Sequence, residues 1–232
     1  MGLASEFGDH SGLSNNSKIT AIVFVVERDL SVRKSLEFLI RSEGLHPESF
    51  GSAQAFLVQP RVNVPSCLIL DVAIPGPNAL ELQKRIASEH SETPIIVVSS
   101  RADISTTVQA IKAGAVEFLT KPFNHDALLA AIRESLERSR LALDRERELR
   151  ELHSRYALLT RRERQVMARV ICGLLNKQTA IELGISEITV KAHRGRVMQK
   201  MKANSLPHLV RMAERLDHEH FVSPSSFLRV AV

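Results

Sequence analysis

Short, mostly apolar segments alternate with stretches of helical periodicity over the first 140 residues, and this alternation restricts the possible folds more than any other feature. Strands are expected at residues 21–26, 66–71, 94–99 and 116–120, and a further strand at the more polar residues 46–50. Helices are expected between them, at residues 31–42, 52–59, 79–88 and 105–113. Strands that alternate with helices in this way predict a doubly wound α/β fold, in which a five-stranded parallel sheet carries helices on both faces.

Polar side chains stand where several of the predicted strands end. In chain order they are Glu27, Arg28, Asp71, Ser99 and Lys121. In doubly wound sheets the functional groups gather outside the carboxyl ends of the strands, so these side chains are expected to form one pocket. No glycine-rich phosphate loop follows the first strand, and no Ser-His-acid or metal-ligand spacing occurs in the sequence. We therefore expect no enzymatic activity.

The segments around these residues resemble the receiver domain of two-component response regulators over about 120 residues. The resemblance rests on LILDVAIPG around Asp71, on Ser99 after PIIVV, and on AGAVEFLTKPF, which contains Phe118 and leads into Lys121 and Pro122. It implies that Asp71 accepts a phosphoryl group from a sensor histidine kinase. It further implies that Lys121 and Ser99 contact that group and that Phe118 is an aromatic switch, although Phe118 could equally be a core aromatic.

One position departs from the receiver pattern. The family ends its first strand with two acidic residues that hold Mg²⁺ together with the phosphoacceptor, whereas this chain has Glu27 and Arg28. Glu27 and Asp71 remain the candidate Mg²⁺ ligands, and Arg28 could either pair with Asp71 or turn to solvent. We expect Mg²⁺-dependent phosphorylation of Asp71 to be impaired. The receiver would then be regulated by a protein partner or ligand; the alternative is a conventional phosphorylation-activated regulator.

Residues 159–201 have the outline of a helix-turn-helix. Three helices are expected, at residues 161–172, 176–183 and 186–201, with Asn176 and Ser186 as N-caps and with Gly173 and Gly184 as breaks. In the third helix Val190, Val197 and Met201 share one face. The opposite face is small and basic. Residues 157–212 contain eleven Lys/Arg against three Asp/Glu, a local balance of +8 in a chain whose total is +5.

This segment resembles the helix-turn-helix of the LuxR/FixJ family. The resemblance rests on Leu159, Thr160, Glu163, Arg164, Gly173, Asn176, Lys177, Gly184–Ser186, Thr189–Lys191 and His193. It implies that the third helix enters the major groove of double-stranded DNA, and that a fourth helix at residues 205–216 often pairs two copies. The expected DNA-binding residues are Thr189, Lys191, Ala192, His193, Arg194, Gly195, Arg196 and Gln199.

A long helix is expected between the two domains, from Asn124 as its cap to about residue 158, because no Pro or Gly interrupts it. Leu129, Ile132, Leu136 and Leu143 begin a coiled-coil-like seam, which continues through Leu149, Leu152 and Tyr156 after a shift of register. This seam favours a parallel homodimer; the alternative is a rigid single-helix spacer.

The sequence thus predicts a cytoplasmic DNA-binding transcription regulator of two-component signalling that makes no membrane contact, since no apolar run is long enough for a spanning helix. The expected divisions are a disordered leader (1–18), the receiver (19–138), the linker helix (139–157), the helix-turn-helix domain (158–218) and a tail (219–232).

Overall fold

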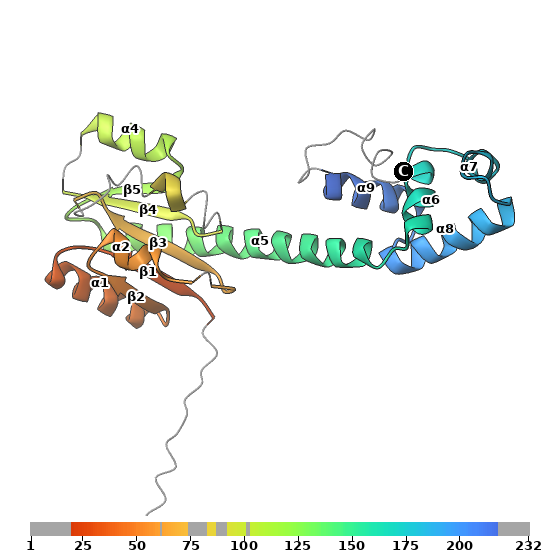
Figure 1. The fold of residues 1–232 in the computed structure, drawn as a ribbon. Coiled ribbons are helices and arrows are strands. Elements are labelled where there is room, and N and C mark those ends of the chain that lie inside the picture. The colour runs from red at the N-terminus through yellow and green to blue at the C-terminus, as the bar shows by residue number, and fades with distance from the viewer. Residues whose placement is uncertain (1–19, 61, 74–82, 87–91, 101–102, 218–232) are drawn as a thin grey trace, which may run out of the picture. The chain divides into compact units, whose positions relative to one another are not determined.

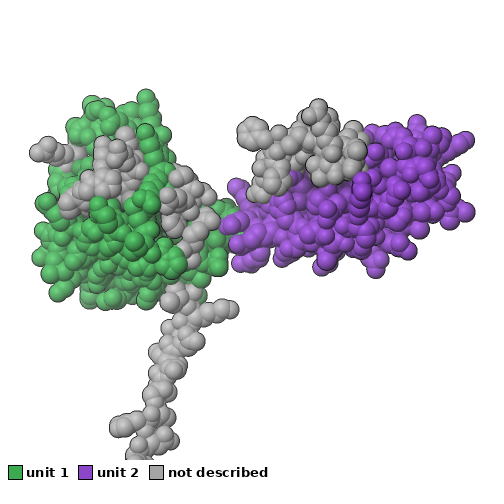
Figure 2. Space-filling model, in the orientation of Figure 1, with its two compact units in different colours: residues 1–143 green, residues 144–232 purple. Residues whose placement is uncertain are grey.

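The computed structural model describes residues 20–60, 62–73, 83–86, 92–100 and 103–217. The chain divides into two compact units, residues 1–143 and residues 144–232, which Figure 2 shows in different colours. The predicted leader and tail lie outside the described residues. No helix in the described part of the chain is long and apolar enough to cross a membrane.

The first unit is built on a five-stranded parallel sheet (Figure 1). Its strands are β1 (Ile22–Val26), β2 (His46–Phe50), β3 (Ser66–Asp71), β4 (Ile95–Ser99) and β5 (Ala115–Thr120). Their order is β2-β1-β3-β4-β5, and every neighbouring pair is parallel. The predicted fold class is confirmed. In β1, β3 and β4 every residue is buried, as expected for strands that are covered on both faces.

Helices cover both faces of the sheet. One face packs against α2 (Ala53–Leu57) and α4 (Ile104–Lys112) through Phe56 and Ala110. The other packs against α1 (Leu30–Ser42) and the first half of α5 (His125–Ala157), through residues such as Ile40 and Ile132. The helix predicted at residues 79–88 lies largely outside the described residues; residues 83–86 of it are helical.

The second unit is all-helical. It contains α6 (Arg161–Ile171), α7 (Asn176–Leu183), α8 (Glu187–Met201) and α9 (Leu206–Asp217), together with the end of α5. Gly184 ends α7 in the left-handed conformation at φ 63°, and Ser186 caps α8 by accepting a hydrogen bond from the Thr189 amide at 3.1 Å. Both features agree with the sequence-based expectation.

The expected cap of α7 is wrong by one residue. The N-cap position is Leu175, and its backbone N–H donates to the Gln178 side chain at 2.8 Å, so Gln178 replaces the missing polar cap. Asn176 already lies inside the helix, where its side-chain oxygen accepts a hydrogen bond from Arg194. An Asn at a helix start can serve either purpose, and the sequence pattern does not distinguish them.

The long helix α5 begins after Asn124, whose side chain accepts hydrogen bonds from the amides of residues 126 and 127, as expected for its cap. The expected seam is divided between two cores. Leu129, Ile132 and Leu136 pack in the receiver core. Leu149, Leu152 and Tyr156 pack in the core of the helical domain. These six side chains therefore have apolar partners within the chain and do not need a second copy.

Candidate functional sites

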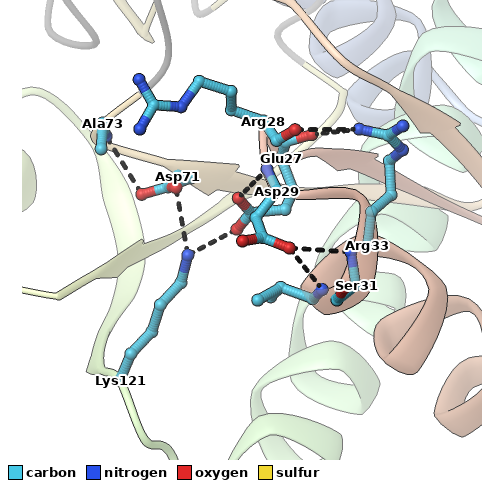
Figure 3. Close-up of polar contacts among 9 residues, drawn as sticks. Glu27, Arg28, Asp29, Ser31, Arg33, Asp71, Ala73 and Lys121 are labelled. Atoms are coloured by element: carbon cyan, nitrogen blue, oxygen red, sulfur yellow. Dashed lines mark hydrogen bonds and ion pairs between the residues drawn. The ribbon is translucent and has the colours of Figure 1, made fainter.

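Two carboxylates and one lysine form an ion cluster at the carboxyl end of the sheet (Figure 3). The Lys121 Nζ donates to Asp71 Oδ2 at 3.0 Å and to Glu27 Oε2 at 2.5 Å. Both carboxylates are almost fully buried, with relative exposures of 5% for Asp71 and 2% for Glu27, and the Lys121 side chain is 16% exposed. The order of the strands in the sheet brings these residues together, because β1, β3, β4 and β5 lie side by side and all run in the same direction.

The second oxygen of each carboxylate is fixed by a backbone amide. Asp71 Oδ1 accepts from the Ala73 N–H at 3.0 Å, and Glu27 Oε1 accepts from the Asp29 N–H at 2.9 Å. Arg33 Nη1 donates to the Glu27 carbonyl at 2.7 Å, which holds the turn between β1 and α1 (Figure 3). The cluster is thus held in place by backbone hydrogen bonds as well as by charge.

The protonation of Lys121 follows from its partners. Burial alone would lower the pKa of its ammonium group, but the hydrogen bonds and charges of Glu27 and Asp71 outweigh burial and raise the pKa above its usual 10.5. Lys121 therefore remains a cation throughout the physiological range and occupies the space between the two carboxylates.

Arg28 does not form the ion pair with Asp71 that the sequence left open. Its side chain is exposed, and Asp71 is instead bonded to Lys121. Asp29 caps α1, because its carboxylate accepts from the amides of Ser31 and Val32 at 2.7 and 3.1 Å (Figure 3). Of the three consecutive charged residues that begin with Glu27, only Glu27 forms a hydrogen bond with Lys121.

Ser99 and Phe118 occupy neighbouring strands near the cluster. Ser99 is buried at the end of β4, and its carbonyl accepts a hydrogen bond from the Lys121 backbone at 2.7 Å. Phe118 is half-buried and packs against the core on the α2 and α4 face of the sheet. This position agrees with the core-aromatic interpretation.

An open cavity of about 510 Å³ lies beside the ion cluster and shares Lys121 with it. Its walls come from α1, through Val32 and Leu39, and from the segment joining β5 to α5, through Pro122 and Phe123. The walls are mostly apolar, and Lys121 is the one Lys or Arg side chain among the described residues that line them.

The second candidate site is the exposed face of α8. Val190, Val197 and Met201 are fully buried, as the helical periodicity predicted. The residues exposed along the helix are Glu187, Ile188, Lys191, Ala192, Gly195, Arg196 and Gln199. A Cβ at Gly195 would meet no atom within 4 Å, so packing within the chain does not require a glycine there.

Three of the eight residues expected to bind DNA are half-buried, and two of these three bond within the domain. Thr189 is half-buried and its hydroxyl lies 2.8 Å from that of Ser186 at the helix cap. The half-buried Arg194 donates to Asn176 at 3.2 Å and so joins α8 to α7. His193 is half-buried as well. A motif pattern does not separate residues that build a helix-turn-helix from residues that face its ligand.

An internal ion pair supports the exposed face and was not anticipated. Glu163 is 2% exposed and accepts from Lys200 Nζ at 2.6 Å and from the Thr160 backbone at 2.8 Å. Lys200 also donates to the Leu158 carbonyl at 3.1 Å. The Thr-x-x-Glu spacing at Thr160 is the signature of a capping box and could have identified the N-terminus of α6, but not the partner on α8.

Comparison with known families agrees with both halves of this arrangement. Residues 23–133 match the response regulator receiver domain, and residues 157–213 match the luxR family of bacterial regulatory proteins. The chain belongs to the response regulators that join a receiver domain to a LuxR-type DNA-binding domain, and it is a transcriptional regulator of that class.

Individual relatives match nearly the whole chain. Nodulation protein W of Bradyrhizobium diazoefficiens is 48% identical over 196 residues, which are 84% of this chain and 86% of the relative. Response regulator protein TodT of Pseudomonas putida is 43% identical over 206 residues, covering 89% and 91% of the two chains. The solved structure of the response regulator StyR is 42% identical, with a TM-score of 0.75, and covers 84% of this chain and 99% of that one.

Proposed function

We propose that the receiver of this regulator is atypical and that Mg²⁺-dependent phosphorylation of Asp71 is impaired. The observation that carries the proposal is the replacement of an acidic metal ligand by Arg28 next to a carboxylate pair that Lys121 already bridges. The usual three acids and one lysine of a receiver sum to −2. Glu27, Arg28, Asp71 and Lys121 sum to zero, so the electrostatic attraction for a divalent cation is largely lost.

The donor atoms at the cluster do not suit a conventional Mg²⁺ site. Mg²⁺ requires a near-octahedral shell of oxygen atoms. Among the described residues no group of three or more His, Cys, Asp or Glu is arranged to hold a metal. The third nearby carboxylate, that of Asp29, is committed to the N-terminus of α1.

Charge reversal at Arg28 tests this proposal. Arg28→Asp restores an acid beside Glu27 and Asp71, so Mg²⁺ affinity should rise by about tenfold or more. Isothermal titration calorimetry measures it directly, since the chain has no Trp to report binding. The matched control is Lys34→Asp, which makes the same charge change at an exposed position on α1 and should leave the affinity unchanged.

Equally tight Mg²⁺ binding by the wild type and by Arg28→Asp would contradict the proposal. It would favour the second candidate, a conventional phosphorylation-activated regulator, which the solvent exposure of Arg28 supports. In that case Glu27 would have to leave Lys121 when the metal binds. Tight binding by both proteins and weak binding by both are distinguishable outcomes, because only the first allows rapid phosphorylation.

For DNA recognition we propose that α8 enters the major groove with its exposed residues facing the DNA. Lys191 and Arg196 supply positive charge, and Ala192, Gly195 and Gln199 form a low surface between them. Lys191 lies 3.6 Å from Glu187, but both side chains are well exposed, so this pair is weak and does not prevent a DNA contact.

Lys191→Ala tests the placement of α8. Loss of one base-edge or phosphate contact should weaken binding by about tenfold. The measurement is fluorescence anisotropy on duplexes selected by the full chain from a random pool. Lys34→Ala in the receiver removes the same charge and should have no effect. If Lys191→Ala binds DNA as tightly as the wild type, the proposed placement of α8 in the groove is wrong.

The proposed protein partners are a sensor kinase or other signalling protein and a second copy of the chain. The apolar cavity between α1 and the start of α5 supports a docking partner for the receiver, because it opens onto Lys121. Homodimerisation through α5 is supported less than the sequence suggested, since six of the seven seam residues of α5, and apolar residues of α9 such as Leu209 and Leu216, pack within their own units.

A further inference from the structure

One large apolar side chain on the proposed reading helix packs into neither core of the helical domain, as far as the described residues go. Ile188 is 80% exposed and does not belong to either core of the helical domain. It lies in the first turn of α8, two residues after the cap Ser186. Recognition helices contact base edges mainly with residues near their N-terminus, so this position is close to the bases when α8 is in the groove.

Helix geometry places Ile188 in the middle of the exposed face. At 100° per residue, Ile188, Ala192, Gly195 and Gln199 fall within about 60° of arc. Their common direction is opposite the fully buried Val197. Lys191 and Arg196 are at the two edges of this stripe. The stripe points at the floor of the groove, and the cations at its edges point toward the flanking phosphates.

The chemistry of this stripe selects its ligand. Ala192 and Gly195 are small and leave room for close approach, and Ile188 is the largest apolar side chain on it. The C5-methyl group of thymine is the apolar feature that the major groove presents. We infer that Ile188 contacts a thymine methyl group and thereby selects thymine at one position of each half-site. This inference rests on the proposed role of α8.

Replacement of thymine by uracil tests the contact, because it deletes only the methyl group. Full-length protein selects duplexes from a random pool, and each thymine of one selected duplex is then replaced singly by uracil. In the wild type, the replacement of one particular thymine in a half-site should weaken binding by about fourfold, as expected for one buried methyl group. The symmetry-related thymine of the other half-site should behave in the same way. For Ile188→Ala, the same replacement should have no effect, because the partner of the methyl group is gone.

The matched control is Ile181→Ala, which removes a 75% exposed isoleucine from α7 in the same domain. It should keep the fourfold sensitivity of the wild type at that position. Circular dichroism melting verifies that both variants fold, and exposed positions of this kind tolerate Ala.

Two results would overturn the inference. One is a uracil profile that is the same for wild type and Ile188→Ala; the other is a set of selected duplexes with no thymine at a fixed position. Failure of the proposed function has a different signature, since Lys191→Ala would then bind the selected duplexes as tightly as the wild type does.

Discussion

Asp29 illustrates at the scale of a residue how one local task excludes another. Hydrogen bonds from the amides of Val32 and Ser31 lower the pKa of its carboxyl group, so it is ionised while it caps α1. The charge of Lys121 also lowers this pKa, so Asp29 lies near the cluster, but its Oδ1 is held by the two amides at the start of α1. Because capping fixes this carboxylate, we expect that the acid one position beyond Arg28 does not replace the acidic ligand of the receiver pattern.

Glu163 makes a residue-scale prediction about stability. Burial alone would raise its pKa, but hydrogen bonds from Lys200 and Thr160 outweigh burial and lower the folded-state pKa below 4.5. Its contribution is therefore present above the unfolded-state value and is lost as the pH falls through the folded-state pKa. At pH 7, Glu163→Gln should reduce the free energy of unfolding by about 2 kcal/mol, and the difference should shrink below pH 4.5.

Tyrosine fluorescence is the suitable measurement, because Tyr156 is the single tyrosine of a chain without Trp and lies in the core of the helical domain. The control is Glu182→Gln. Glu182 is 50% exposed and pairs with Arg169, so the loss should be below about 1 kcal/mol. A loss at Glu163 as small as the loss at Glu182 would show that the buried pair is not stabilising.

Gly195 makes a second prediction, in which stability and affinity change in opposite directions. Gly195→Ala should stabilise the domain by about 0.5–1 kcal/mol, because the new methyl group meets no atom of the chain and Ala is the better helix former. It should also weaken DNA binding by about tenfold, since the methyl group would separate α8 from the base edges.

Denaturant unfolding and DNA anisotropy on the same samples measure both changes. Gly184→Ala is the contrasting variant, because Gly184 has φ +63° and an L-residue there is strained, so it should destabilise the domain. A Gly195→Ala protein that is more stable and binds DNA as tightly as the wild type would contradict the close approach.

The sequence predicted residue types better than residue contacts. The burial of Val190, Val197 and Met201 followed from helical periodicity, because periodicity defines which face of a helix is apolar. The internal bonds of Arg194 and Lys200 did not, because a long cationic side chain can reach either a neighbouring helix or a ligand. Ile188 was not among the expected DNA-binding residues, because that face of the helix was described as small and basic and Ile188 is a large apolar residue.

At the scale of elements, α5 shows the limit of pattern analysis. Its extent, its cap and its ion pairs Glu146–Arg150 and Glu151–Arg155 were predictable, because all three depend on local spacing. The partners of its leucines were not, because an apolar seam has the same period whether it packs against a second chain or against its own domains. The shift of register in the seam coincides with the change from one core to the other.

The helix α4 offers an alternative surface for a second copy. Ile104, Val108 and Ile111 are 84%, 43% and 46% exposed and recur at helical spacing, so they form one apolar stripe on the receiver. If two chains pair through this stripe, Val108→Glu should shift the light-scattering molar mass from dimer to monomer, because it places a charge in an apolar interface.

The matched control is Phe38→Glu on α1, where an apolar side chain that is 76% exposed is replaced in the same way. It should leave the molar mass unchanged. If Val108→Glu is still a dimer, the exposed face of α5 becomes the alternative interface. A wild type that is monomeric at all concentrations would exclude a constitutive dimer through either surface.

At the scale of the whole molecule, the fold was predictable from the alternation of strands and helices, and the location of the cluster followed from the strand ends. The state of the cluster was not predictable. Lys121, and not Arg28, pairs with Asp71, because the Lys121 side chain is long enough to reach it and the backbone amides of Ala73 and Asp29 hold the two carboxylates in place. Residue spacing encodes none of these features.

Intact mass and light scattering, measured before and after treatment with acetyl phosphate and Mg²⁺, test whether phosphorylation of Asp71 regulates the protein. Because Glu27, Arg28, Asp71 and Lys121 together carry no net charge, we expect no phosphoryl adduct on the wild type, whereas Arg28→Asp should gain one phosphoryl group. Asp71→Asn in the Arg28→Asp background is the control and should lose the adduct, which assigns the modification to Asp71.

The molar mass then separates two kinds of regulator. A wild-type protein that dimerises and binds DNA without any adduct must receive its signal from a partner or ligand, and the cavity beside Lys121 is the place to seek it. A wild type that gains the adduct as fast as Arg28→Asp shows that Arg28 leaves the chemistry intact and that Glu27 releases Lys121 when the metal arrives. DNA affinity measured on the same samples shows whether either event at the receiver reaches α8.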